Sequence, residues 1–133
     1  LSLMVRFNYW HSTAIIRDCE FIENESGSKG GAISVSNRAN PNFINCVIQK
    51  NQANSGGALH ATDLSHPYFF NSSFLYNSAV SRAGAIHAST KSVLIFANST
   101  ISGNTSPKGP GGGLLVEDNA SVELLNSIVS VGF

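Results

Sequence analysis

The sequence predicts an all-β protein, a right-handed, single-stranded parallel β-helix of about four to five coils of roughly 27 residues. Three observations favour this fold class. Short motifs recur at a nearly constant spacing, apolar residues alternate with period two within each repeat, and no segment has the 3.6-residue spacing of an amphipathic helix. Chain chirality favours right-handed winding.

The repeats are aligned rows of glycine and asparagine. Gly-Ala or Gly-Gly precedes an apolar residue at Gly31, Gly57, Gly84 and Gly112, with spacings of 26, 27 and 28 residues. After Asp18, one amide row continues through Asn45, Asn71, Asn98 and Asn126. A second row lies six residues later, at Asn24, Asn51, Asn77 and Asn104. Rows that keep register over several units predict stacked coils, each adding one strand to each sheet.

Each coil is expected to contain three short strands. The first strand starts at the apolar residue of the glycine motif, as in residues 33–35 and 59–61; the second ends at the Phe43 column, and the third crosses the Ile48 column. We expect the glycines of the Gly31 row to take positive φ where the coil turns, and both asparagine rows to tolerate left-handed backbone. Stacked amides are expected to hydrogen-bond along each row as a structural ladder.

Composition excludes several classes of protein. The 133 residues have a formal net charge of zero, and only 12% are charged, so a nucleic-acid partner is not expected. Asn (14) and Ser (20) are abundant, which disfavours helices. No apolar run approaches the ~18 residues of a membrane span. We predict a single β-helix domain over residues 1–133, as a segment of a longer solenoid, because residues 3–5 and 129–133 are apolar and strand-prone.

Two motifs alternate along the chain. Residues 21–24 (FIEN) and 74–77 (FLYN) match FxxN, and residues 30–33 (GGAI) and 56–59 (GGAL) match GGA[ILV]. The chain thereby resembles the repeats of polymorphic outer membrane proteins, and its last third resembles bacterial right-handed parallel β-helix repeat proteins. The resemblance implies a pectate-lyase-like solenoid at a cell surface. Ile48, Ile101 and Ala83 depart from the two motifs.

Two pairs of residues are candidates for metal binding or catalysis, and each also has a structural interpretation. His60 and His87 follow the first strand residue on adjacent coils and point outward; we interpret them as a solvated or hydrogen-bonded pair, and only weakly as metal ligands. Asp63 and Asp118 lie two coils apart, ~9.6 Å, within the range of an inverting glycosidase pair. They are weak catalytic candidates, because no other acidic or basic residues gather around them.

Cysteines and sequons add two smaller predictions. Cys19 and Cys46 share an inward column, where two buried thiols are favoured and a disulfide stays open as an alternative. Five N-x-[ST] sequons occur, but four coincide with ladder positions. Asn119, in a surface turn, is the one glycosylation candidate.

These observations favour a noncatalytic extracellular or cell-surface module that acts as a structural stalk and adhesive surface, without a cofactor. Its expected partners are further coils or other chains at the open ends, and cell-surface glycans. Two alternatives stay open. One is a fragment of a carbohydrate-active β-helix enzyme, a polysaccharide lyase or hydrolase, and the other is a filament subunit that stacks end to end.

Overall fold

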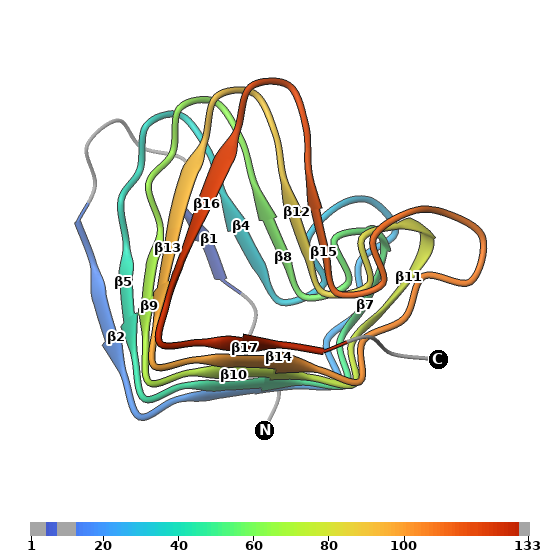
Figure 1. Ribbon diagram of the computed structural model, residues 1–133, viewed down its shortest axis with the longest axis horizontal. Coiled ribbons are helices and arrows are strands. Elements are labelled where there is room, and N and C mark those ends of the chain that lie inside the picture. The colour runs from blue at the N-terminus through green and yellow to red at the C-terminus, as the bar shows by residue number, and fades with distance from the viewer. Residues whose placement is uncertain (1–4, 8–12, 131–133) are drawn as a thin grey trace.

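A computed structural model describes residues 5–7 and 13–130, and these residues form an all-β parallel solenoid (Figure 1). Three five-stranded parallel sheets run along it, with one strand per coil. Sheet A contains β1 (Val5–Phe7), β4 (Ile33–Val35), β8 (Leu59–Ala61), β12 (Ile86–Ala88) and β15 (Leu114–Val116). Sheet B contains β2 (Ile15–Arg17), β5 (Asn42–Ile44), β9 (Tyr68–Phe70), β13 (Val93–Ala97) and β16 (Ser121–Leu125). Sheet C contains β3 (Glu20–Ile22), β6 (Val47–Gln49), β10 (Ser73–Leu75), β14 (Thr100–Ser102) and β17 (Ile128–Val129).

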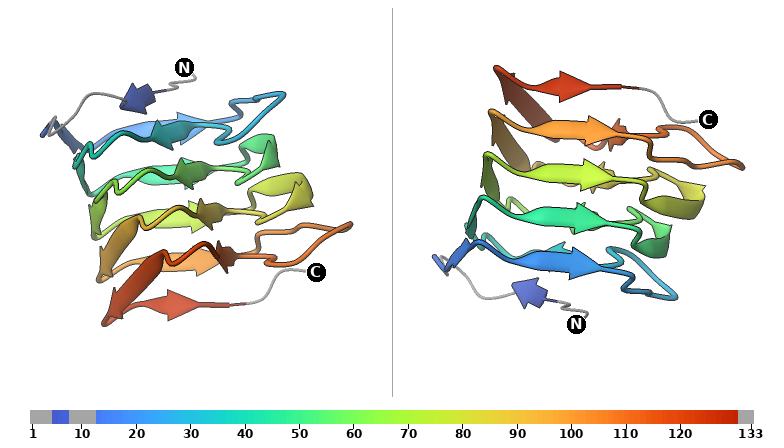
Figure 2. Two further views of the ribbon diagram at one scale, coloured as in Figure 1. Left: turned by 90° about the horizontal axis from the view of Figure 1, so that it is seen from above. Right: turned by 90° about the horizontal axis from the view of Figure 1, so that it is seen from below.

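The register between coils is the one that the sequence rows predict. Ile33 pairs with Leu59, and Ile86 pairs with both Leu59 and Leu114, so the first strand of each coil lies directly on its predecessor. Figure 2 shows the resulting stack, with the first and last described coils at opposite ends. The predicted fold class and the three-strand coil are therefore confirmed. Of the apolar end segments, residues 3, 4 and 131–133 lie outside the described part of the chain, as do residues 8–12 of the opening coil.

A fourth, two-stranded sheet lies in the loops that vary in length. Sheet D pairs β7 (Gln52–Ser55) with β11 (Ser78–Arg82) and was not expected from the sequence. The next loop adds only an isolated bridge between Ser78 and Thr105. Pro107 follows, and because proline has no N–H it cannot extend the ladder. The loops project beside sheet A and away from sheet B (Figure 1).

Stacked phenylalanines fill the interior. The ring centroids of Phe43 and Phe69 lie 4.6 Å apart, and those of Phe69 and Phe96 lie 5.0 Å apart, with interplanar angles of 8° in both pairs. Phe74 packs edge-on against both Phe69 and Phe96. All four side chains are fully buried. Because successive coils place the same residue type one strand spacing apart, the interior repeats coil by coil.

The second asparagine row forms a buried amide ladder, which we call the interior ladder: Asn24, Asn51, Asn77 and Asn104. Asn77 Oδ1 accepts hydrogen bonds from the Asn51 backbone N–H (2.9 Å) and from Asn51 Nδ2 (3.0 Å). Asn77 Nδ2 in turn donates to the Ile48 carbonyl at 3.1 Å and to Asn104 Oδ1 at 2.9 Å. Each side chain therefore satisfies backbone and amide groups on the neighbouring coils, where an unpaired buried polar group would be costly.

The first asparagine row forms an exposed ladder at the corner between sheets B and C. Asn45 Nδ2 donates to Asp18 Oδ1 at 2.7 Å, Asn71 Nδ2 to Asn45 Oδ1 at 3.3 Å, and Asn126 Nδ2 to Asn98 Oδ1 at 2.6 Å. All five residues of this row have φ between 48° and 54°, so the left-handed backbone predicted for it is present.

In two rows, the left-handed backbone occurs one residue before the position that the sequence predicts. The left-handed residues beside the interior ladder are those that precede the asparagines, namely Glu23, Lys50, Tyr76 and Gly103. Likewise, positive φ falls on the residues before the Gly31 row: Gly30, Gly56, Ala83 and Gly111. The turn glycines Gly31, Gly57 and Gly84 are instead needed for space, because a Cβ there would overlap carbonyl oxygens of the adjacent coil or loop; at Gly112 the nearest atom would be the Asn104 carbonyl oxygen at 3.4 Å.

Candidate functional site

A connected group of polar side chains lies between the outer face of sheet A and the loops. His87, on β12, points away from the coil interior, as the sequence predicts for its column. The residue is nevertheless only 3% exposed, so of the two states that the sequence left open, solvated or hydrogen-bonded, the structure has the hydrogen-bonded one. The loop carrying Ser55 covers it, and Ser55 Oγ lies 2.8 Å from His87 Nδ1.

A carboxylate on the next coil completes the group. Glu117 Oε1 lies 2.6 Å from His87 Nε2, and Arg82 Nη1 lies 3.0 Å and 3.2 Å from the two Glu117 oxygens. The hydrogen bond from His87 is the main cause that holds the pKa of Glu117 below its usual range, and Arg82 adds to it. Glu117 is therefore ionised at neutral pH. In the neutral ring, His87 Nε2–H then donates to Glu117 while Nδ1 accepts from the Ser55 hydroxyl.

His60 stacks beside this group on the preceding coil. The ring centroids of His60 and His87 lie 5.1 Å apart, and His60 Nε2 contacts Ser89 Oγ at 3.5 Å. The pKa of His60 is lowered to about 4, mainly by burial and in smaller part by the charges of His87 and Lys29, while Glu117 acts in the opposite direction. His60 is thus neutral over the physiological range. The hydrogen-bonded histidine pair that the sequence predicts is present in part, since each ring binds a serine.

Ser55, His87 and Glu117 are of the residue types that serve as nucleophile, base and orienting carboxylate in hydrolases, and they are hydrogen-bonded in that order. Two facts argue against catalysis in the observed conformation. Ser55 is only 4% exposed. The neighbouring backbone N–H groups of Gly56 and Gly57, which would be candidates to stabilise an oxyanion, already donate to the carbonyls of Arg82 and Ala83. The side-chain hydrogen bonds and the ion pair link the loops to sheet A, and we call the group the loop latch (Ser55, Arg82, His87, Glu117).

In the described part of the chain, His60 and His87 have no further metal-ligating side chains arranged around them. Among residues 5–7 and 13–130, no cluster of three or more His, Cys, Asp or Glu side chains is arranged to hold an ion. Two imidazoles alone are too few for a metal site.

Asp63 and Asp118 lie in matching turns between sheets A and B. Both are exposed and have left-handed backbone, with φ of 53° and 54°. The Asp63 carbonyl accepts a hydrogen bond from Arg38 N–H, and the Asp118 carbonyl accepts one from Lys91 N–H, both at 3.0 Å. Each therefore connects its turn to the turn of the preceding coil. The structure therefore gives both residues a turn role, for which Asp is suited. Asn119 follows Asp118 in the same turn and is exposed with φ of 62°, so its amide is accessible.

The two cysteines are free thiols on adjacent coils. Cys46 Sγ approaches the carbonyls of Ile44 and Ile16 at 3.5 Å and 3.6 Å, and burial raises the pKa of this thiol. The Cys46 backbone N–H donates a hydrogen bond to Ser72 Oγ at 3.2 Å. The interpretation as stacked thiols agrees with this geometry, but only Cys46 is buried, whereas Cys19 is half-buried.

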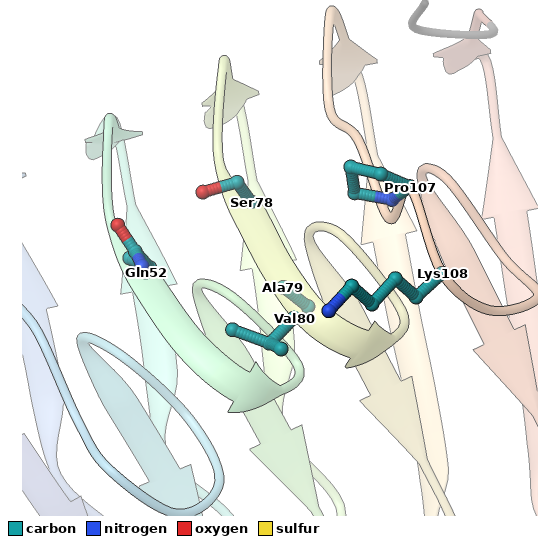
Figure 3. Close-up of a pocket in the computed structure, with 6 residues that line it drawn as sticks. All are labelled: Gln52, Ser78, Ala79, Val80, Pro107 and Lys108. Carbon is teal, nitrogen blue, oxygen red and sulfur yellow. The ribbon is translucent and has the colours of Figure 1, made fainter.

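A shallow groove of about 270 Å³ opens between the edge of β11 and the following loop (Figure 3). Ala79 and Val80 form its apolar floor, and Pro107 and Lys108 lie along its outer side. The groove exists because Pro107 interrupts the backbone ladder there. It does not include the loop latch, and its polar lining residues are Gln52, Ser78 and Lys108, without a carboxylate among them.

The loop latch was missed from the sequence, although one signal for it exists. Glu117 occupies the position that Ser36, Thr62 and Ser89 hold on earlier coils, so it is the one acidic residue in its column. Its coil adjoins that of His87. Ser55 and Arg82 each precede a left-handed residue, and only the folded loop shows that such residues reach forward to the next coil.

Comparison with known proteins places the chain in a structural class, the right-handed β-helices. A family model described as a right-handed β-helix region matches residues 8–132. The chain therefore belongs to the right-handed β-helix family. No curated protein and no solved structure matches it at a significant level. Within the described residues there is no helix of the length and apolarity that crossing a bilayer would require.

Proposed function

We propose that this chain is a noncatalytic module of an extracellular or cell-surface protein, acting as a structural stalk with an adhesive surface. The observation that carries the proposal is the continuity of the interior ladder and the phenylalanine stack through successive coils. These interactions join coil to coil along the solenoid axis. A load along that axis is thus shared by backbone pairs in three sheets and by buried amides, which is the mechanical requirement of a stalk.

The repeat type is part of the same proposal. In the FxxN motif, Phe21 packs in the core and Asn24 belongs to the interior ladder. In the GGA[ILV] motif, Gly56 supplies the left-handed turn and Gly57 the close approach to the next coil. Each motif position thus has a structural reason, which supports repeats like those of polymorphic outer membrane proteins.

Adhesion is assigned to the loops and the exposed side chains, with cell-surface glycans as the proposed ligand. The groove at Val80 and Lys108 combines an apolar floor with one cationic rim residue, and exposed Tyr76 lies on the neighbouring corner. The Lys108 ammonium favours an acidic sugar over a neutral one, and the aromatic ring offers an apolar face for the sugar's C–H groups.

A carbohydrate-active enzyme is the second candidate, favoured by the exposure of Asp63 and Asp118 on one line of turns. One experiment separates the two functions. The purified chain is incubated with acidic polysaccharides, and binding, reducing ends and unsaturated products are measured together. The stalk proposal expects retention on the polysaccharide without product. Turnover that Asp63→Asn abolishes and Asn119→Asp leaves intact would overturn it.

A third candidate is end-to-end assembly with further coils or other chains. In the last described coil, Leu124 and Val129 are exposed, whereas their partners on the previous coil, Phe96 and Ile101, are buried. A coil stacked on this edge would bury them. Light scattering tests the proposal, because end-to-end growth gives species without an upper size limit.

A further inference from the structure

The outer face of sheet B is an apolar surface that nothing in the described chain covers. Six of its outward side chains define what we call the B face: Ile15, Ile44, Tyr68, Phe70, Ile95 and Leu125. They alternate with inward residues such as Phe43 and Phe69, which are fully buried. Ile15, Phe70 and Leu125 are 59%, 38% and 47% exposed. The loops lie on the other side of the solenoid (Figure 1).

The residues of the B face stack in two columns, in one of which the polar side chain of Asn42 separates Ile15 from Tyr68. Ile44, Phe70 and Leu125 lie in one column with Ala97, and Tyr68 and Ile95 lie in the other. With strands ~4.8 Å apart, the five strands of sheet B span about 20 Å along the axis. Contiguous exposed apolar surface of this kind marks interaction sites in soluble proteins.

Two opposite charges close the two ends of the B face. Arg17 lies on the first strand, in the column of Ile44 and Phe70, and Glu123 lies on the last strand, in the column of Tyr68 and Ile95. Both side chains are exposed. Four coils separate them, so they cannot pair within one chain. Among the described residues, the ion pairs present involve Arg82, His87 and Glu117 instead.

We propose that the B face binds the B face of a second copy of this chain in an antiparallel dimer. A two-fold axis parallel to the strands reverses one solenoid, so the last coil of one copy lies over the first coil of the other. This places Glu123 of each copy diagonally beside Arg17 of the other, and two symmetric ion pairs then flank a shared apolar centre at Tyr68 and Phe70. A parallel pairing would bring like charges to the same ends and form no such pairs. Face-to-face sheets pack about 10 Å apart, a gap that Arg and Glu side chains span together.

The size of the face determines how strong the dimer is. A strip about 20 Å long and two residue columns wide buries roughly 500–600 Å² over both copies, below the about 1,200 Å² of a stable interface. The dimer is therefore expected to be weak and to dissociate on dilution. The zero net charge of the chain adds no long-range repulsion between copies.

Sedimentation equilibrium from about 5 µM to about 1 mM tests the proposal on the chain as it exists. The expected result is a monomer–dimer equilibrium that does not proceed to larger species. Phe70→Asn is expected to weaken the dimer at least tenfold. The matched control Tyr76→Asn removes a more exposed aromatic residue (64%) from outside the B face and is expected to leave the dimer unchanged. Circular dichroism of each variant confirms that it folds.

A charge exchange distinguishes this geometry from other modes of association. Arg17→Glu and Glu123→Arg are each expected to weaken the dimer about tenfold, and the double variant is expected to restore it. A chain that stays monomeric at the highest concentration would overturn the proposal. Association that is insensitive to both Phe70→Asn and Arg17→Glu would overturn it as well, and open-ended growth would indicate the end-to-end assembly described above instead.

Discussion

The buried, neutral imidazole of His60 makes the stability of this protein depend on pH. In the unfolded chain a histidine has a pKa near 6.5, whereas burial and neighbouring charges lower the pKa of His60 to about 4 in the folded chain. Between these two values the unfolded state binds a proton that the folded state does not. The free energy of unfolding therefore decreases as pH falls, by about 1.4 kcal/mol per pH unit. The decrease amounts to about 2 kcal/mol at pH 5 and about 3 kcal/mol below pH 4.

Urea unfolding of the wild type and of His60→Gln measures this contribution. Glutamine does not titrate and retains a group that can hydrogen-bond Ser89. Because carboxylates titrate in both proteins, the informative quantity is the difference between them. From about pH 7.5 to about pH 5, the wild type should lose about 2 kcal/mol more than the variant. His66→Gln, at an exposed turn position, should behave as the wild type. Equal pH dependence in the wild type and His60→Gln would refute the reasoning.

Three further predictions concern the coil interior. Asn77→Ala should lower the free energy of unfolding by about 3–4 kcal/mol, because it leaves buried donors unpaired, whereas Asn71→Asp in the exposed ladder should cost less than about 1 kcal/mol; denaturant melts of both check this. Gly57→Ala should destabilise by at least about 3 kcal/mol through overlap with two backbone carbonyls, while Gly27→Ala, which has open space around it, should not change the thermal midpoint measurably. The Cys46 thiol should react with a disulfide reagent only slowly in the native protein and rapidly once it is unfolded, and equal rates in the two states would contradict its burial.

The regular part of this molecule could be predicted from the sequence because the repeat imposes it. Once Gly57 and Asn51 are aligned with their counterparts one coil away, strand positions, register and the inward column of Phe43 and Phe69 follow from the period. The displaced left-handed positions show the limit of that approach. A glycine or asparagine row indicates a turn but does not show which residue has the left-handed backbone. Position 57 requires glycine because backbone carbonyls lie close to it, whereas the positive φ is at Gly56.

The loop latch could not be predicted for a different reason. Ser55 and Arg82 belong to loops of unequal length, so their direction depends on how each loop folds back on sheet A. From the sequence alone, an outward column such as that of His60 and His87 is expected to be solvated. Only the folded positions of the loops show that the column is covered. Burial of the two rings, and the lowered pKa of His60, are thus tertiary properties that periodicity does not contain.

A stalk requires that all coils behave as one body, and residue-resolved amide hydrogen exchange tests this most directly. The backbone N–H groups of Asn24, Asn51 and Asn77 each donate to the side chain of the asparagine on the following coil. We predict that these three amides exchange only through global unfolding, with one common free energy that equals the value from denaturant unfolding. Exchange of any of them through local opening, with free energies that differ from coil to coil, would contradict the account.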